Sequence, residues 1–282
     1  PQEQYPILIE DLTSTQSGAQ VLGIHLEGPF INPKQKGAHN LTHVCSFEEI
    51  DDVEFFYGNL EHVKLVTLAP ELPRAITFIK QLKDRNILIS AGHTQATYNQ
   101  MQEGIASGIT LATHLFNAMT PFNHRAPGVI GAVLTNPKMY YSIIADGIHV
   151  HPKAIELAWK ANPAGVILIT DAISALGLPS GNYHLGTMDV TVENGKATLT
   201  GSETIAGSVI SLDAAVRYFY QATGCSLVEA IECASLHPAT LLGISRQKGT
   251  LDVGSDADFI ILDSELHVYA TYINGELKYK RD

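Results

Sequence analysis

The sequence has 282 residues, 45% of them hydrophobic and 17% charged, which is typical of a globular protein with a substantial buried core. Its 29 acidic residues outnumber the 18 basic ones, so the formal net charge is -11. This balance argues against general nucleic-acid binding but permits a small anionic ligand, because such a ligand needs only a few local donors.

The sequence carries no sign of a membrane or secretory destination. No apolar stretch is long enough to span a bilayer, and no signal peptide is visible. The three cysteines, Cys45, Cys225 and Cys233, are sparse and lack CxxC spacing. They indicate free thiols in a reducing compartment, and we therefore expect a cytoplasmic protein.

Six short apolar runs, each ended by a polar or glycine-containing turn, predict β-strands. Helical spacing follows most of them, and Thr94 and Pro152 are placed to begin two of the helices. Repeated strand–helix units of this kind predict a parallel sheet with fold class α/β. An acidic run at 48–52 predicts a solvated helix face. The predicted strands are Val21–Ile24, Val63–Leu68, Ile87–Ala91, Ile109–Thr113, Tyr140–Ala145 and Val166–Thr170.

The pattern changes after Asp171. Two alternating runs around Asn194-Gly195, within Met188–Thr200, predict a β-hairpin. Amphipathic spacing from Leu212 to Phe219 predicts a helix, and 226–242 predicts further helix interrupted before Pro238. Strands are predicted at 259–262 and 268–273. We expect a barrel region over 1–185, a hairpin over 186–203, closing helices over 204–247 and the strands of a small β-domain over 248–282.

Polar side chains stand at or just past the ends of the predicted strands: Glu27, His93, His114, His149 and Asp171. In a barrel these ends meet on one face, so residues distant in sequence would lie close together. A carboxylate and two imidazoles suit one divalent ion, Zn²⁺ first, with Fe²⁺, Co²⁺, Ni²⁺ or Mn²⁺ as alternatives. Asp171 could then take a proton from water and pass it to a leaving group. For each histidine alone, a purely structural role competes with this interpretation.

Two further segments are candidates for binding an anion. His149-Val150-His151 is an H-x-H pair, but the backbone turns there, so His149 is a better anion ligand than a chelator and His151 is better explained as a helix end. In the loop after His114, Arg125 could bind a phosphate with help from the backbone near Asn117. The alternative for Arg125 is an ordinary surface residue.

Several motifs together resemble those of the N-acetylglucosamine-6-phosphate deacetylases of the amidohydrolase superfamily, and 66–72 and 237–244 look nearer the animal form. The resemblance covers essentially the whole chain in order. The motifs are HLEGPF (25–30), KGAHN (36–40), SAGHT (90–94), THLFNAM (113–119), IADGIHV (144–150) and ITDA (169–172), followed by LHPATLLGI (236–244) and KGTLDVGSDADFIILD (248–263).

The resemblance implies a TIM-barrel-like (β/α)8 hydrolase of N-acetyl-D-glucosamine 6-phosphate that releases acetate and D-glucosamine 6-phosphate. It implies one divalent metal per subunit and a homodimer with its phosphate site near the interface. The implied metal ligands are Glu27, His93 and His114, the implied catalytic residues are Asp171 and His39, and the implied substrate contacts are His39, Asn117, Ala118, Arg125, His149 and Ile205.

Compared with this family, the sequence lacks the N-terminal β-rich segment and the first two barrel strands. We therefore expect a fragment containing barrel strands three to eight plus a small β-structure, poorly stable alone because a partial barrel leaves open edges. A second metal site stays undetermined. Two other functions remain open: another amidohydrolase acting on a cyclic amide or aminated base, and an inactive phosphosugar-binding fragment.

Overall fold

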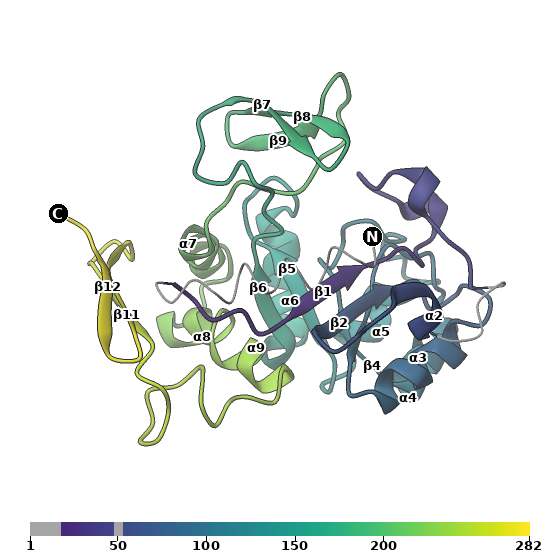
Figure 1. Ribbon diagram of the computed structural model, residues 1–282, viewed down its shortest axis with the longest axis horizontal. Coiled ribbons are helices and arrows are strands. Elements are labelled where there is room, and N and C mark those ends of the chain that lie inside the picture. The colour runs from purple at the N-terminus through teal and green to yellow at the C-terminus, as the bar shows by residue number, and fades with distance from the viewer. Residues whose placement is uncertain (1–17, 48–52) are drawn as a thin grey trace.

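The computed structural model describes residues 18–47 and 53–282 (Figure 1). The acidic run at 48–52 and the first 17 residues therefore lie outside the described part of the chain. Within that part, no helix combines the length and the apolar character that crossing a membrane requires.

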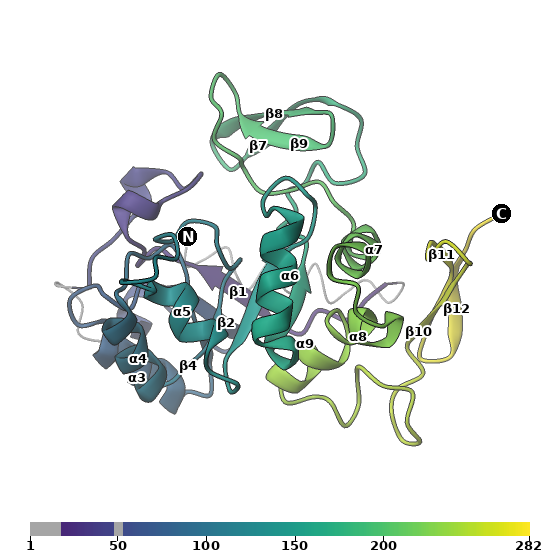
Figure 2. The same cartoon turned by 180° about the vertical axis from the view of Figure 1, so that it is seen from behind.

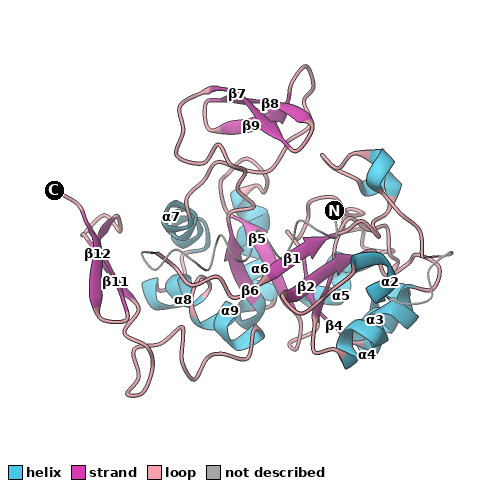
Figure 3. Ribbon diagram, in the orientation of Figure 1, coloured by secondary structure: helices cyan, strands magenta, loops and turns pink. Residues whose placement is uncertain are grey.

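A six-stranded parallel sheet forms the centre of the fold (Figure 3). Its strands follow one another in chain order, β1-β2-β3-β4-β5-β6, and every neighbouring pair is parallel. This confirms the predicted α/β class, and five of the six predicted strands agree with the structure to within one residue at each end. The strands are β1 Ile24–Glu27, β2 Val63–Leu68, β3 Leu88–Ala91, β4 Ile109–Ala112, β5 Tyr140–Ile144 and β6 Val166–Ile169.

The first strand was predicted three residues too early. The structure places β1 at Ile24–Glu27 instead of Val21–Ile24. Side chains of His25 and Glu27 alternate with buried Leu26 and point to the same face, where the His25 ring bonds Thr67 Oγ1 at 2.7 Å. A strand with a polar inner face carries no continuous apolar run, so the apolar residues before it misled the prediction.

Helices cover the outer face of this sheet (Figure 2). Two expectations about them need correction. Thr97, not Thr94, caps α4 in a capping box with Gln100. The buried helix α5 was missed, because it is apolar on every side and shows no amphipathic period. Pro152 begins α6 as predicted. The helices are α2 Val53–Tyr57, α3 Ala75–Asp84, α4 Tyr98–Ser107, α5 Gly128–Leu134 and α6 Pro152–Ala161, with short 3-10 turns η1 Pro33–Gln35, η2 Leu41–His43 and η3 Pro163–Gly165.

Beyond β6 the chain builds two small antiparallel sheets separated by three helices (Figure 1). The predicted hairpin is present as β8 and β9, but β7 joins it and β12 joins the final sheet, so both sheets have three strands. The predicted helix break precedes Leu236, which leaves Pro238 inside the first turn of α9. The elements are β7 Gly181–Leu185, β8 Met188–Glu193, β9 Lys196–Leu199, α7 Leu212–Thr223, α8 Leu227–Glu232, α9 Leu236–Leu241, β10 Phe259–Leu262, β11 Val268–Ile273 and β12 Glu276–Lys280.

The open edge of β6 is covered by the junction between α8 and α9. The backbone N–H of Leu168 donates to the Cys233 carbonyl at 2.8 Å. The His237 ring donates through Nδ1 to the Val166 carbonyl at 2.7 Å. These bonds give partners to two backbone groups of an edge strand that would otherwise face outward unpaired.

An aromatic cluster secures the loop that follows β1. Phe30, Phe47 and Phe78 are each at most 1% exposed. The Phe30 and Phe47 ring centroids lie 4.1 Å apart, and those of Phe47 and Phe78 lie 4.4 Å apart. Because this cluster ties the loop after β1 to α3, it fixes the start of the loop that leads to the candidate site.

We expect Phe47→Ala to lower the free energy of unfolding by about 3–5 kcal/mol, since it removes a buried ring and leaves a cavity. Urea denaturation of the intact protein measures this change. The matched control is Phe122→Ala, whose ring is 57% exposed and whose loss should cost far less. Equal destabilisation by the two variants would contradict the assignment of the cluster to the core.

Candidate active site

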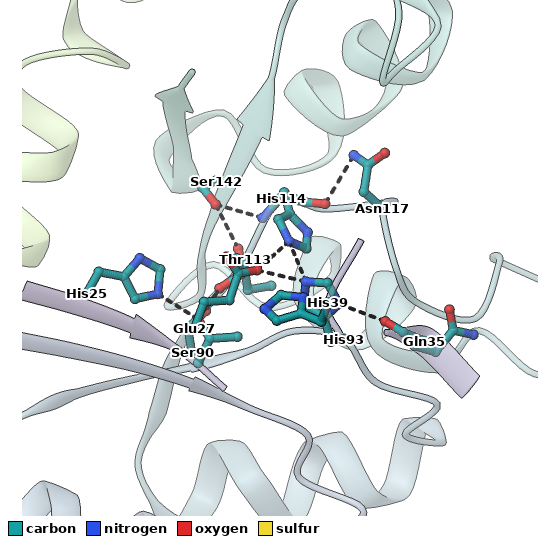
Figure 4. Close-up of polar contacts among 12 residues, drawn as sticks. His25, Glu27, Gln35, His39, Ser90, His93, Thr113, His114, Asn117 and Ser142 are labelled. Carbon is teal, nitrogen blue, oxygen red and sulfur yellow. Dashed lines mark hydrogen bonds and ion pairs between the residues drawn. The ribbon is translucent and has the colours of Figure 1, made fainter. Parts of the chain in front are cut away.

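Three side chains from different strand ends meet at the carboxyl edge of the sheet (Figure 4). Glu27 is the last residue of β1, while His93 and His114 each stand two residues past β3 and β4. Glu27 Oε1 lies 2.8 Å from His93 Nε2 and 2.7 Å from His114 Nε2, and the two Nε2 atoms are 3.1 Å apart. The structure thus brings together the three residues predicted as metal ligands.

The hydrogen bonds around His93 indicate that this cluster needs a positive charge at its centre. His93 Nδ1 lies 2.7 Å from the Gln35 carbonyl, and because a carbonyl only accepts, Nδ1 carries the proton. In a neutral ring, Nε2 then presents a lone pair to the Glu27 carboxylate. Two acceptors at this distance repel unless a cation or a proton lies between them. One carboxylate oxygen and two imidazole nitrogens are donors that suit a divalent transition metal.

The electrostatics of the cluster agree with this requirement. Burial alone would raise the pKa of Glu27, but the hydrogen bonds from His114 and His93 lower that pKa well below its usual range. Burial would likewise lower the pKa of His114, but Glu27 raises it through its hydrogen bond and charge. The site therefore stabilises one negative carboxylate and favours positive charge beside it.

An unusual backbone conformation orients the side chains of the site. The φ angles of His93, His114 and Asp171 are 48°, 33° and 50°, in the left-handed region that few non-glycine residues occupy. Gly37 has φ 55°, and a Cβ there would lie 3.3 Å from the His93 ring. A glycine is favoured here, because any side chain would combine this tight contact with a strained backbone. Strain of this kind is typical of functional sites, where the surrounding fold holds it.

Asp171 stands two residues past β6, and the charges of His114, Glu27, His149 and His93 all act on its carboxyl group. Burial raises its pKa, and although His114 opposes the rise, Glu27 adds to it. The Asp171 carbonyl accepts from the Ser208 N–H at 2.8 Å, and the Ser208 carbonyl in turn accepts from the Ile173 N–H at 3.0 Å. Ser208 therefore holds the backbone at Asp171 and directly after it.

His39 lies beside the cluster, with its ring centroid 4.6 Å from that of His93. Its Nδ1 donates to the Lys36 carbonyl at 3.1 Å, which leaves Nε2 of the neutral ring as an acceptor. Burial lowers the pKa of His39, and nearby His93 lowers it further, so the neutral form is favoured.

His149 forms a close pair with Asp146 in the turn after β5. Asp146 Oδ2 lies 2.6 Å from His149 Nδ1, while Oδ1 accepts from the backbone N–H groups of Ile148 and His149 at 2.8 Å each. Burial would raise the pKa of Asp146, but these bonds lower it. His151 instead caps α6 by accepting from the Lys153 N–H, as predicted for a helix end.

The remaining predicted residues are not among the three members of the cluster. The Asn117 amide bonds back to the His114 and Leu115 carbonyls at 3.3 and 3.4 Å. The Ala118 carbonyl accepts from the Thr94 N–H at 3.0 Å and so ties two site loops together. Arg125 lies in an exposed turn. Ile205 is half-buried and bridges to Thr198 in β9.

Sequence reasoning missed several residues that orient the site. The Gln35 carbonyl fixes the His93 ring, a backbone role that no side-chain pattern could reveal. Asp146 was noted only as part of a turn, although a carboxylate directly past a strand and three residues before a histidine was an available signal. Below the cluster, hydroxyls of Thr67, Thr113 and Ser90 bond one another at 2.7 and 2.6 Å within the sheet interior.

The fold and the site together define an α/β-barrel type of protein with a candidate metal centre at its carboxyl edge. The Amidohydrolase family model matches residues 7–278. The chain therefore belongs to the amidohydrolase family.

Comparisons with known proteins agree with this assignment. The chain is 49% identical over 273 residues to an N-acetylglucosamine-6-phosphate deacetylase of Homo sapiens, covering 94% of this chain and 66% of the human protein. It is 40% identical to an N-acetylgalactosamine-6-phosphate deacetylase of Escherichia coli O157:H7, covering 92% and 69% respectively. The chain thus spans about two thirds of the length of these relatives.

A solved structure with the same fold contains a sugar phosphate. A mutant of the N-acetyl-D-glucosamine-6-phosphate deacetylase of Mycobacterium smegmatis, in complex with N-acetyl-D-glucosamine-6-phosphate, superimposes with a TM-score of 0.90 at 33% identity. The match covers 98% of this chain and 72% of that one. The fold of this chain therefore corresponds to the major part of the fold of that solved protein.

We expect His114→Ala in the intact protein to reduce bound divalent metal from about one ion per chain to nearly none, because it removes one of three protein ligands. Elemental analysis after dialysis measures this loss. His124→Ala is the matched control, since His124 lies exposed in the same loop and should leave metal content unchanged. Full metal retention by His114→Ala would contradict the assignment of the site.

Proposed function

We propose that the protein carrying this chain is a metal-dependent deacetylase that hydrolyses N-acetyl-D-glucosamine 6-phosphate to D-glucosamine 6-phosphate and acetate. The observation that carries the proposal is the convergence of Glu27, His93 and His114 on one point, with the acid Asp171 beside them. The names of the relatives support the substrate.

Glu27 Oε1, His93 Nε2 and His114 Nε2 would hold the ion. When bound, a divalent ion supplies Lewis acidity: it lowers the pKa of water and polarises a carbonyl. Zinc is our first choice, with iron, cobalt, nickel and manganese as alternatives that the same donors accommodate. The Gln35 carbonyl keeps the His93 proton on Nδ1 and so keeps Nε2 ready to bind the metal.

Asp171 is the proposed general base and then acid. Its carboxylate takes the proton of the attacking water and later delivers a proton to the amine nitrogen as the amide C–N bond breaks. Burial raises the pKa of Asp171, and a raised pKa suits this double role, because the group must both accept and release a proton near neutral pH. The position of Asp171 among the charges of the cluster supports the assignment.

His39 is the proposed substrate-orienting residue. Because its Nδ1 proton is engaged by the Lys36 carbonyl, Nε2 of the neutral ring accepts a hydrogen bond from a sugar hydroxyl or an amide N–H. The resemblance also makes His39 a catalytic residue that helps to polarise the acetyl carbonyl, a role for which the ring must present a proton on Nε2. We therefore propose that His39 holds the sugar in its neutral form and polarises the carbonyl when Nε2 carries a proton.

The phosphorylated end of the sugar is assigned to the residues around the cluster. His149, held by Asp146, and Arg125 supply positive or donor groups, while Asn117 and the backbone at Ala118 supply amide donors. Ile205 contributes an apolar wall. Because Arg125 lies in an exposed turn, a neighbouring subunit has room to complete this part of the site, and we propose a homodimer.

The compartment follows from cysteine chemistry. Cys45, Cys225 and Cys233 are all free thiols. Free thiols persist where the environment is reducing, so we place the protein in the cytoplasm.

A second substrate is favoured by one specific observation, the 40% identity to an N-acetylgalactosamine-6-phosphate deacetylase. The two sugars differ in the configuration of one hydroxyl. Acetate release measured from both substrates, each at concentrations around its KM, decides between them by the ratio of kcat/KM values.

We expect Asp171→Asn to lower kcat for acetate release from N-acetylglucosamine 6-phosphate by about 10²–10⁴-fold, since the amide cannot accept the proton. Bound metal should stay at the wild-type level. Asp189→Asn is the matched control, because its side chain is 70% exposed in β8. Wild-type turnover by Asp171→Asn would exclude Asp171 as the base, and no acetate release by metal-loaded wild type would exclude the proposed function.

We expect Arg125→Ala to raise KM for the phosphorylated substrate about tenfold or more, because it removes a charged donor to the phosphate. Slow hydrolysis of unphosphorylated N-acetylglucosamine should be unaffected. Steady-state kinetics on both substrates measure this split, with the exposed Arg246→Ala as control. Equal losses on the two substrates would contradict phosphate binding by Arg125.

A further inference from the structure

We propose that Glu71 is a positioning residue whose carboxylate fastens together the two loops around His93 and so holds that histidine ready to bind metal. The inference rests on the metal site proposed above. Glu71 touches neither the cluster nor the proposed substrate contacts. It stands three residues past β2, the strand that lies between β1 and β3 in the sheet.

Three donors from two loops converge on this one carboxylate. Glu71 Oε1 accepts from the Asn32 side-chain amide at 2.9 Å and from the Gln95 N–H at 2.6 Å. Its Oε2 accepts from the Thr94 hydroxyl at 2.5 Å. Asn32 belongs to the loop after β1, whereas Thr94 and Gln95 directly follow His93 in the loop after β3.

Through Asn32, Glu71 also supports the Nδ1 side of the His93 ring. Asn32 Oδ1 accepts from the Lys34 N–H at 2.9 Å and so caps the turn η1, which ends at Gln35. The Gln35 carbonyl accepts from His93 Nδ1 at 2.7 Å, and the Asn32 N–H donates to the His93 carbonyl at 2.8 Å. Glu71 therefore fixes the amide orientation on which the support of His93 depends.

The bond to Thr94 fixes the other side. Thr94 is fully buried, its hydroxyl accepts from the Ala96 N–H at 2.9 Å, and its own N–H donates to the Ala118 carbonyl at 3.0 Å. With the hydroxyl proton given to Glu71, every polar group of Thr94 that bears a proton has a partner. His93 thus sits between two anchored neighbours, which suits its left-handed backbone.

The hydrogen-bond donors and acceptors around Glu71 predict which substitutions separate the two loops. Glu71→Ala removes the acceptor of all three donors and leaves the buried Thr94 hydroxyl unpaired. Glu71→Gln keeps an oxygen for Asn32 and Gln95, but its amide donates to the Thr94 hydroxyl and leaves the hydroxyl proton without its acceptor. Asn32→Asp retains the oxygen that caps η1 but places a carboxylate against Glu71. The first and third variants break the contacts between the two loops, and the second keeps those to Asn32 and Gln95 while losing the one from Thr94.

The test is the dissociation constant for Zn²⁺, measured on the metal-stripped intact protein by competition with a chromogenic chelator. We expect Glu71→Ala and Asn32→Asp to weaken binding by about 10–100-fold, the range found for partners that orient metal ligands. Glu71→Gln, which loses only the contact from Thr94, should bind zinc more tightly than these two variants and more weakly than wild type. Glu156→Ala is the matched control, because Glu156 also accepts two hydrogen bonds, from Lys153 and Lys160 on α6.

Each result decides a different claim. Wild-type zinc affinity in folded Glu71→Ala and Asn32→Asp would overturn the positioning role while leaving the proposed function intact. If Glu71→Ala does not fold, Asn32→Asp decides alone. If the wild type binds zinc but releases no acetate, the proposed reaction is contradicted and the positioning role of Glu71 is not. Failure of the wild type to bind zinc would overturn both.

Discussion

The structure depends on one electrostatic constraint: three electron-rich atoms from separate strands are held within about a hydrogen bond's length of each other. Glu27 Oε1 and the Nε2 atoms of His93 and His114 lie 2.7–3.1 Å apart. Such a cluster is stable only with positive charge at its centre. A parallel sheet brings these atoms together, because the carboxyl ends of its successive strands all lie at the same edge.

This arrangement strains the backbone of the site loops, and the buried core holds that strained backbone in place. Four of the residues assigned to the site, His93, His114, Ala118 and Asp171, adopt positive φ. Directly behind these loops lie the aromatic cluster and the buried strands β2 to β4, and the hydroxyls of Thr67, Thr113 and Ser90 bond one another inside the sheet. The rigid part of the fold therefore lies next to the strained part. Glu71 extends this support outward into the loops.

Sequence reasoning found the parallel sheet and the three convergent residues because both leave local signals. Apolar runs mark buried strands, and a histidine or carboxylate directly past such a run marks the edge of the sheet. The first strand was misplaced because its inner face carries His25 and Glu27, so polarity needed for the site removed the signal for the strand. Helix α5 was missed for the opposite reason, since it is buried on all sides.

Side-chain partners across loops could not be predicted in the same way. The pairing of Asp146 with His149, the tautomers set by the Gln35 and Lys36 carbonyls, and the convergence on Glu71 all depend on loop conformation. Each of these loops includes residues with positive φ. From sequence, a positive φ is expected mainly at glycine. The chemistry of the ligands was therefore predictable, whereas the means of orienting them was not.

The most direct test of this account is zinc K-edge X-ray absorption on the metal-loaded intact protein. The account predicts a shell of nitrogen and oxygen ligands at about 2.0–2.1 Å, with the outer-shell scattering of two imidazole rings. In His93→Ala, which removes one of the three protein ligands, the zinc signal itself should fall to nearly nothing. A sulfur shell at about 2.3 Å, or a spectrum unchanged by loss of His93, would contradict the central claim that Glu27, His93 and His114 hold the metal.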